Sequence, residues 1–256
     1  MIRQRPIVLS LTNLLKKIAE YSIFALILLS PIAHAVNTTS TTKLPKSLTF
    51  STSSHAAVEH YYQPLIQAAY QRLGIDIEFL QLNEERSIRL LDQGLLDGDT
   101  IRTENIHKSN SHFIPVQMLG EARIYLVCQP HIECNANLLE QKKFSLGSVG
   151  GSSHFDDLLA DSEITQLRYT NYHLLKTSFE QGKIDAYIEI ISAHYHQQAF
   201  PQKANTAYLE TIHGFHYLHE SHARLAPQVA AAIKEIQNQI HKEDDSCWKA
   251  FQKPSN

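Results

Sequence analysis

Two arginines stand where a carboxylate-bearing molecule could be bound. Arg102 follows Asp97 by five residues, at the carboxyl end of a predicted strand, and open α/β sheets bind their ligands at that end. Arg86 lies near the start of a predicted helix, where it could instead face solvent or pair with Glu84 or Glu85. Because a guanidinium donates two parallel hydrogen bonds to a carboxylate, we predict Arg102 and Arg86 as ligand-binding residues.

A turn rich in glycine and serine, Gly150-Gly151-Ser152-Ser153, separates a predicted strand from a helix that begins near His154. Backbone N–H groups at the start of a helix favour an anion, and serine hydroxyls can cap the helix or reach a ligand. Gly151, Ser152 and Ser153 are therefore candidate ligand-binding residues. Capping of the helix by Ser153 without any ligand is the alternative.

Three cysteines are present, and two of them are close in sequence. Cys128 and Cys134 are six residues apart around Pro130. In an exported protein such a pair favours a disulfide, while free thiols, or a metal site that includes His131, are the alternatives. The pairing of Cys247 stays open.

The many histidines do not form a metal motif. A run with steps of three residues cannot place four ligands on one face of a strand or of a helix. The members of this run are His213, His216, His219 and His222. The chain also has no nucleophile elbow, no His-Glu-x-x-His and no phosphate-binding Gly-Lys-Ser/Thr loop, so we expect no metal, no cofactor and no enzymatic activity.

The elements that must position these residues alternate between strand and helix. Strands are predicted at 48–52, 75–82, 96–102, 144–149, 166–169 and 184–190, and helices at 61–73, 84–93, 154–161, 172–181 and 225–241. Two extended stretches, 113–128 and 207–217, interrupt this alternation. The pattern predicts an α/β fold of two lobes with mainly parallel sheets, joined by a hinge that the chain crosses twice.

The N-terminus has the pattern of a secretory signal. Four basic residues precede an apolar run that is too short to cross a bilayer, and the small residues Ala33 and Ala35 flank His34 before the predicted cut after Ala35. An uncleaved anchor is the alternative. Residues 1–35 are thus assigned to the signal and 36–47 to a flexible tether, and we expect the rest to reach the periplasm.

Composition excludes several classes of protein. The chain has 256 residues, 43% hydrophobic and 19% charged, which is typical of a globular protein and long enough for one large domain or two lobes. Its formal net charge is −3, and the predicted signal contains four of the basic residues, so the exported part is more acidic. A nucleic-acid partner is not expected, because such proteins are usually basic.

The ordered segments LGI-x-I-x-F, ERSIRLLDQGLLDGD, FIPV, KFSLGSVGGSS, LLKTSFEQGKIDAYIE and YLHESHARLAPQVAAAI resemble bacterial extracellular solute-binding proteins of the polar amino-acid type. The resemblance covers nearly all of 48–242 and implies the type II periplasmic binding fold, in which two lobes close over a small ligand. We expect one lobe at 48–117, the second at 118–206 and a return to the first at 207–256. Asp97 and Asp185, each three residues after a glycine, are expected to be structural.

The resemblance also implies an amine site, and here the sequence departs from the family. Relatives have an acidic residue just beyond the strand that carries IDA, and Glu189 is one position short of the expected spacing. Ser53 to His55 stand where relatives have an aromatic residue. Glu189, His55 and Ser53 are candidate ligand-binding residues, but the ligand could differ from an ordinary amino acid, or tight binding could have been lost.

These observations predict a monomeric periplasmic protein that captures a small, polar, carboxylate-bearing molecule by hinge closure and delivers it to an ABC permease. The first alternative is a ligand sensor that signals to a membrane kinase or cyclase. The second is an enzyme on the same fold.

Overall fold

The structure is a computed structural model that describes residues 44–104, 112–150, 152–195 and 200–243. The predicted signal and tether, Gly151 and Cys247 lie outside the described residues. Within the described part, no helix has both the length and the apolar composition needed to span a membrane.

Eight strands form one mixed sheet in the order β2-β1-β3-β8-β4-β7-β5-β6. The strands are β1 (Ser47–Thr52), β2 (Asp76–Gln81), β3 (Gly98–Thr103), β4 (Phe113–Cys128), β5 (Ser145–Val149), β6 (Thr165–Tyr169), β7 (Ala186–Ser192) and β8 (Asn205–His219). The pairs at both edges are parallel, whereas β3 with β8, β8 with β4 and β4 with β7 are antiparallel. The expected α/β fold with two lobes and a double crossing is confirmed, with an antiparallel centre between the parallel parts.

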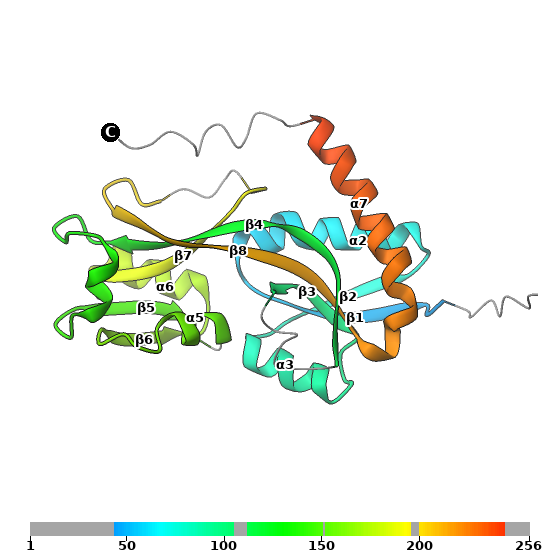
Figure 1. Cartoon of the computed structure of the whole chain (residues 1–256), viewed down its shortest axis with the longest axis horizontal. Helices are drawn as coiled ribbons and strands as arrows, with labels where there is room; N and C mark the ends of the chain where they lie inside the picture. Colours follow the sequence, from blue (N-terminus) through cyan, green and yellow to red (C-terminus); the bar gives the residue numbers. More distant parts are fainter. Residues whose placement is uncertain (1–43, 105–111, 151, 196–199, 244–256) are drawn as a thin grey trace, which may run out of the picture. The chain divides into compact units, whose positions relative to one another are not determined.

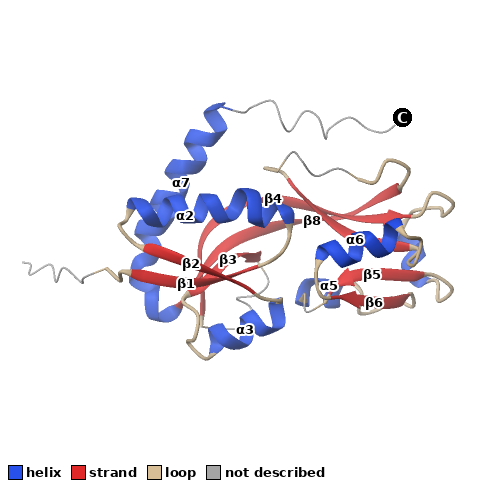
Figure 2. Cartoon of the chain, turned by 180° about the vertical axis from the view of Figure 1, so that it is seen from behind, coloured by secondary structure: helices blue, strands red, loops and turns tan. Residues whose placement is uncertain are grey.

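The helices cover the two ends of this sheet. They are η1 (Val58–Tyr62), α2 (Gln63–Arg72), α3 (Glu84–Asp92), η2 (Ala136–Glu140), α5 (Ser153–Leu158), α6 (Tyr172–Glu180), η3 (Glu220–Leu225) and α7 (Ala226–Glu243). Figure 1 shows α2, α3 and α7 around β1, β2 and β3, which form the first lobe. Figure 2 shows α5 and α6 beside β5 and β6 in the second lobe.

The two long strands β4 and β8 connect the lobes. They pair over most of their lengths, from Phe113 with His219 to Cys128 with Asn205, and the register shifts at three places along the ladder. One end of β8 also pairs with β3 of the first lobe, and β4 pairs with β7 of the second. After β8 the chain returns to the first lobe, where α7 packs against α2 (Figure 1).

Each lobe has its own apolar core. In the first lobe, Phe50, Ile66 and Tyr70 pack with Ile233 of the returning helix α7. In the second, Leu126 and Ile188 of the antiparallel strands pack with Leu146 and Phe155. Because each lobe buries its own apolar cluster, its stability does not depend on what fills the space between the lobes.

The two lobes repeat the same turn between a helix and a strand. Gly94 and Gly182 end α3 and α6 with positive φ angles of 66° and 67°, a conformation that glycine adopts without strain. The aspartate that follows each turn accepts a backbone hydrogen bond from the first strand of its lobe, Asp97 from Thr49 at 2.7 Å and Asp185 from Ser145 at 2.8 Å. Both aspartates therefore have the structural contacts expected for them.

The structure contains the predicted disulfide between Cys128 and Cys134. It closes a short loop after β4, and Cys128 is fully buried in the second lobe. Because closing such a loop restricts the unfolded chain, we expect reduction to lower the free energy of unfolding by about 2 kcal/mol.

Urea denaturation with and without dithiothreitol measures this loss. The variant Cys134→Ser is the control, since its stability should not respond to the reductant. Non-reducing peptide maps should contain the linked pair, and a bridge from Cys247 to either cysteine would contradict the assignment.

Candidate functional site

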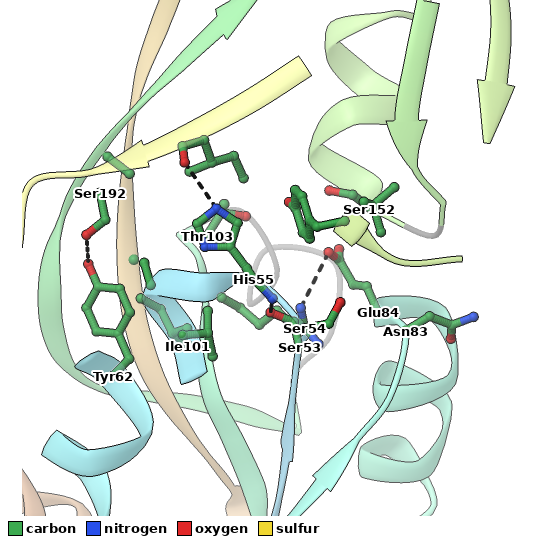
Figure 3. Close-up of a pocket in the computed structure, with 18 of the residues that line it drawn as sticks. Ser53, Ser54, His55, Tyr62, Asn83, Glu84, Ile101, Thr103, Ser152 and Ser192 are labelled. Carbon is green, nitrogen blue, oxygen red and sulfur yellow. Dashed lines mark hydrogen bonds and ion pairs between the residues drawn. The ribbon is translucent and has the colours of Figure 1, made fainter. Parts of the chain in front are cut away.

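A cavity of about 370 Å³ lies between the lobes. Its walls come from the loops after β1 and β2, from the end of β3, from the middle of β4 and β8, and from the loops after β5 and β6. The polar residues on these walls include Ser53, Ser54, Asn83, Glu84, Arg102, Thr103, Ser152, Thr170, Asn171 and Ser192. Several of them are drawn in Figure 3. The parallel strands of each lobe thus present their carboxyl ends to the same space, as open sheets generally do.

Arg102 lies near the end of β3 and lines the cavity. Its side chain is only 11% exposed, and its Nε donates to Oδ2 of Asp99 at 2.9 Å. Although burial lowers the pKa of Arg102, the carboxylates of Asp99 and Glu84 raise it, and the net change is upward. Nη2 is buried and has no hydrogen-bond partner among the described residues, so this arginine retains donors for a further acceptor.

Asp99 is the residue that fixes this arginine. It is 1% exposed and accepts hydrogen bonds from the hydroxyls of Ser51 at 2.6 Å and Ser87 at 2.8 Å. A carboxylate that these donors hold in place also holds the guanidinium in one orientation. The positive charge at the cavity wall is therefore built into the core of the first lobe.

Glu84 joins the two lobes. Its Oε1 accepts from the backbone N of Ser153 at 3.0 Å and from the Ser153 hydroxyl at 2.7 Å. Its Oε2 lies 3.8 Å from Nη1 of Arg102. Figure 3 shows Glu84 projecting from the first lobe toward the Ser152 turn of the second.

His55 and Tyr62 also connect the first lobe to β7. Nε2 of His55 is 3.1 Å from the Ile190 carbonyl, which can only accept, and the ring lies edge-on to Tyr172 at 4.7 Å between centroids. The Tyr62 hydroxyl is 2.9 Å from the Ser192 hydroxyl (Figure 3). The structure therefore shows the lobes in contact on both sides of the cavity.

Glu189 lies behind the cavity wall and does not line it. It is 1% exposed, its Oε2 is 2.8 Å from Nζ of Lys176, and its Oε1 is 3.7 Å from Nε2 of His55. Burial raises the pKa of this carboxyl, but hydrogen bonding to His55 and the charge of Lys176 together lower it by more. The net pKa of Glu189 is therefore below its usual range. The side chain expected to bind an amine is thus already paired with a lysine of the chain.

The other predicted site residues are placed as follows. Ser53, His55, Arg102 and Ser152 line the cavity. Ser153 faces Glu84, whereas Arg86 is exposed on α3 and is not part of the lining. Gly151 lies outside the described residues.

Two residues of this site, Glu84 and Asp99, are not among those that the sequence predicts for it. A signal for Asp99 was present, since a carboxylate three residues before an arginine on a strand can reach it when the strand bends, and β3 has a register shift between these two residues. The role of Glu84 depends on Ser153, which is 69 positions away in the chain. No local pattern indicates that contact.

One group of described side chains has the spacing of a metal site, and none of its members lines the cavity. Ligand atoms of His112, His219 and Glu220 lie within 4.8 Å of one another. His219 is therefore placed beside His112, whose ring stacks on it with 6.1 Å between the centroids. These atoms already serve contacts within the chain, because Nδ1 of His112 is 2.7 Å from Glu220 and Nδ1 of His219 is 2.8 Å from the Ser221 hydroxyl.

No family model matches the chain, and no curated protein matches it in sequence. Solved structures do resemble it. An ancestral arginine-binding protein bound to arginine matches with a TM-score of 0.61 and 16% identity, over 77% of this chain and 97% of that one. A substrate-binding protein of an ABC uptake transporter from Streptococcus pneumoniae, with bound histidine, matches with a TM-score of 0.62 and 15% identity, over 77% and 92%.

The ligand-binding core of GluR0 from Nostoc punctiforme, in complex with L-glutamate, matches with a TM-score of 0.63 and 11% identity, over 81% of this chain and all of that one. At these identities the likeness establishes the fold, which is that of the type II periplasmic binding proteins.

Proposed function

We propose that this protein is a periplasmic solute-binding protein that takes a small, polar, carboxylate-bearing molecule into the cavity between its lobes. The observation that carries the proposal is the cavity itself, with Arg102 on its wall and a guanidinium nitrogen that has no hydrogen-bond partner among the described residues. A volume of about 370 Å³ is at the small end of ligand sites, which suits a molecule of the size of an amino acid.

The chemistry of the cavity supports a carboxylate. Nη2 of Arg102 is buried and has no partner in the part of the chain that the structure describes, and such a donor is unfavourable unless a ligand satisfies it. Serine and threonine hydroxyls around it, including those of Ser53, Ser152 and Thr170, can donate or accept further hydrogen bonds. The three similar structures are described as holding arginine, histidine or glutamate, which supports an amino-acid-like ligand.

A thermal-shift screen against amino acids, opines, polyamines and small organic acids tests the proposal. A ligand at 100 times its dissociation constant adds about 2.7 kcal/mol to the free energy of unfolding. For a chain of this size, that corresponds to an increase in Tm of about 5–11 °C.

The matched control fills the cavity. Ser54→Trp places a large side chain on the wall and should abolish the shift, whereas Ser47→Trp, at an exposed position outside the lining, should retain it. If Ser54→Trp responds to the same compound as strongly as the parent protein, that compound binds elsewhere and the site is misassigned.

We further propose that the loaded protein delivers its ligand to an ABC permease, and that it acts as a monomer in the periplasm. The alternative partner is a membrane sensor, which the likeness to the GluR0 ligand-binding core supports. Uptake of the radiolabelled ligand by a strain that lacks this protein separates the two. Loss of uptake supports transport, and normal uptake with loss of a ligand response supports sensing.

A further inference from the structure

Glu84 is the only described side chain on the cavity lining that is hydrogen-bonded to Ser153 of the opposite lobe. Oε1 of its carboxylate accepts both hydrogen bonds from Ser153, and Oε2 lies next to Arg102. An acceptor that receives both a backbone N–H and a hydroxyl while it faces a guanidinium is in the environment that a bound carboxylate needs. We call these contacts the Glu84 bridge.

The Glu84 bridge and a ligand carboxylate cannot use this environment together. Arg102 supplies a single positive charge, and Asp99 already lies 2.9 Å from its Nε. With Glu84 at 3.8 Å, a third carboxylate would add like-charge repulsion that the guanidinium cannot balance. The donors of Ser153 are also fully used by Oε1 of Glu84.

The position of Glu84 allows its side chain to leave without disrupting the fold. Glu84 is the first residue of α3, but the helix is capped by Asn83, whose Oδ1 accepts from the backbone N of Arg86 at 2.9 Å. The core side of the same helix is formed by Ser87 and Leu91, which are buried. A rotation of the Glu84 side chain therefore breaks its hydrogen bonds to Ser153 of the second lobe and its contact with Arg102 of its own lobe, and leaves the cap and the buried face of α3 in place.

We propose that Glu84 is an internal substitute for the ligand's carboxylate: it holds the lobes together in the ligand-free protein, and a carboxylate-bearing ligand must displace it. The part of this inference that names a carboxylate-bearing ligand as the competitor of Glu84 rests on the proposed function. The other part, that Glu84 holds the lobes together, does not depend on any ligand. Consequently, the bridge lowers apparent affinity, because binding first requires the closed, self-occupied state to open.

Small-angle X-ray scattering of the ligand-free protein tests the closing role. Glu84→Ala should have a larger radius of gyration than the parent protein, because one of the contacts between the lobes is lost, and the remaining contacts of His55 and Tyr62 then hold the lobes closed in fewer molecules. Glu85→Ala is the matched control, since Glu85 is the next residue of the same helix turn and is exposed. Its radius of gyration should equal that of the parent. An unchanged value for Glu84→Ala overturns the inference, whether or not any ligand is known.

Binding of defined probes tests the competition. Isothermal calorimetry with L-arginine and L-histidine should give dissociation constants at least tenfold lower for Glu84→Ala than for the parent, equivalent to about 1.4 kcal/mol, and unchanged values for Glu85→Ala. Agmatine and histamine, which lack the carboxylate, should gain nothing from the substitution. An equal gain for agmatine and L-arginine would show that Glu84 blocks space or charge in general, and would overturn the carboxylate assignment.

The two measurements also separate this inference from the proposed function. If no probe binds either protein but Glu84→Ala expands, the bridge stands and the ligand class is wrong. If the probes bind the parent and Glu84→Ala equally and neither protein changes in size, the binding function stands and the bridge is refuted. Ser153→Ala removes only the hydroxyl donor from the opposite lobe and should produce a smaller expansion than Glu84→Ala.

Discussion

Replacing Arg102 with alanine is expected to lower the free energy of unfolding of the ligand-free protein by about 3 kcal/mol. Removal of one partner from a buried ion pair typically costs about 3–5 kcal/mol, because the other charge stays buried and uncompensated. Here that other charge is Asp99, which is 1% exposed. The lower end of the range applies, since the hydroxyls of Ser51 and Ser87 still donate to Asp99 after the substitution.

Urea denaturation of the parent, Arg102→Ala, Asp99→Asn and the double variant measures this effect as a double-mutant cycle. The sum of the two single losses in the free energy of unfolding should exceed the loss measured for the double variant, because each single substitution removes the same ion pair. Arg86→Ala is the matched control, and its stability should stay within about 0.5 kcal/mol of the parent, since Arg86 is exposed. A loss of that same small size for Arg102→Ala would show that the pair with Asp99 does not contribute.

The same substitution should also weaken ligand binding. Loss of a charge-assisted hydrogen bond costs about 1.5–3 kcal/mol, which corresponds to about 10- to 150-fold in the dissociation constant. Arg102→Lys should lose affinity as well, because an ammonium cannot reproduce the guanidinium's donors to Asp99 and to a ligand. From the sequence alone, an arginine facing a cleft is expected to affect binding and leave stability unchanged. The buried contact with Asp99 makes it contribute to both.

The fold was predictable because its signals are local. Gly94 and Gly182 each end a helix with positive φ, and the aspartate three residues later ties the next strand to its lobe. Apolar periodicity identified the helices and strands, and the extended stretches 113–128 and 207–217 identified the two long strands that connect the lobes. Each of these patterns is decided by neighbours a few residues away in the chain.

The site was less predictable, because its contacts are decided by how the lobes meet. Arg102, Ser53 and His55 line the cavity because they follow strands at the carboxyl edge of the sheet, which the sequence does indicate. Glu84 meets Ser153 only when both lobes are folded and closed, and nothing in either segment encodes that approach. Glu189 is displaced from the cavity because successive residues of a strand point to opposite faces, so a shift of one position in β7 moves a side chain out of the site.

Acidification from pH 7.5 to pH 5 is expected to lower the free energy of unfolding by about 2 kcal/mol through His216 alone. This histidine is fully buried beside Phe50 and Tyr70 in the core of the first lobe. Its Nδ1 faces the Thr100 carbonyl at 3.3 Å, which can only accept, so Nδ1 bears the proton and Nε2 accepts from the Tyr70 hydroxyl at 2.8 Å. The neutral ring satisfies both contacts, whereas a protonated ring would have to donate from Nε2, and the Tyr70 hydroxyl could then no longer donate to it.

Burial lowers the pKa of His216 to about 4, although the hydrogen bond to Thr100 acts in the opposite direction. In the unfolded chain the pKa of a histidine is about 6.5. Between these values the unfolded state binds a proton that the folded state does not, so the stabilisation is complete above about pH 6.5 and decreases as the pH falls toward 4. The total loss in the free energy of unfolding through His216 is about 3 kcal/mol. Glu189, whose pKa is lowered, loses its own contribution to stability only below about pH 4.5, so most of the loss through His216 comes before it on acidification.

Urea denaturation at several pH values between 7.5 and 5 measures the difference against His216→Gln, which cannot titrate. The substitution itself changes the core, so the quantity compared is the slope of stability with pH and not its absolute value. The parent should lose about 2 kcal/mol more than His216→Gln over this range. His173→Gln, at an exposed position on α6, should retain the parent's slope. If His216→Gln follows the same pH dependence as the parent, then the buried ring accepts a proton in the folded state, and its contacts with Thr100 and Tyr70 do not hold it neutral.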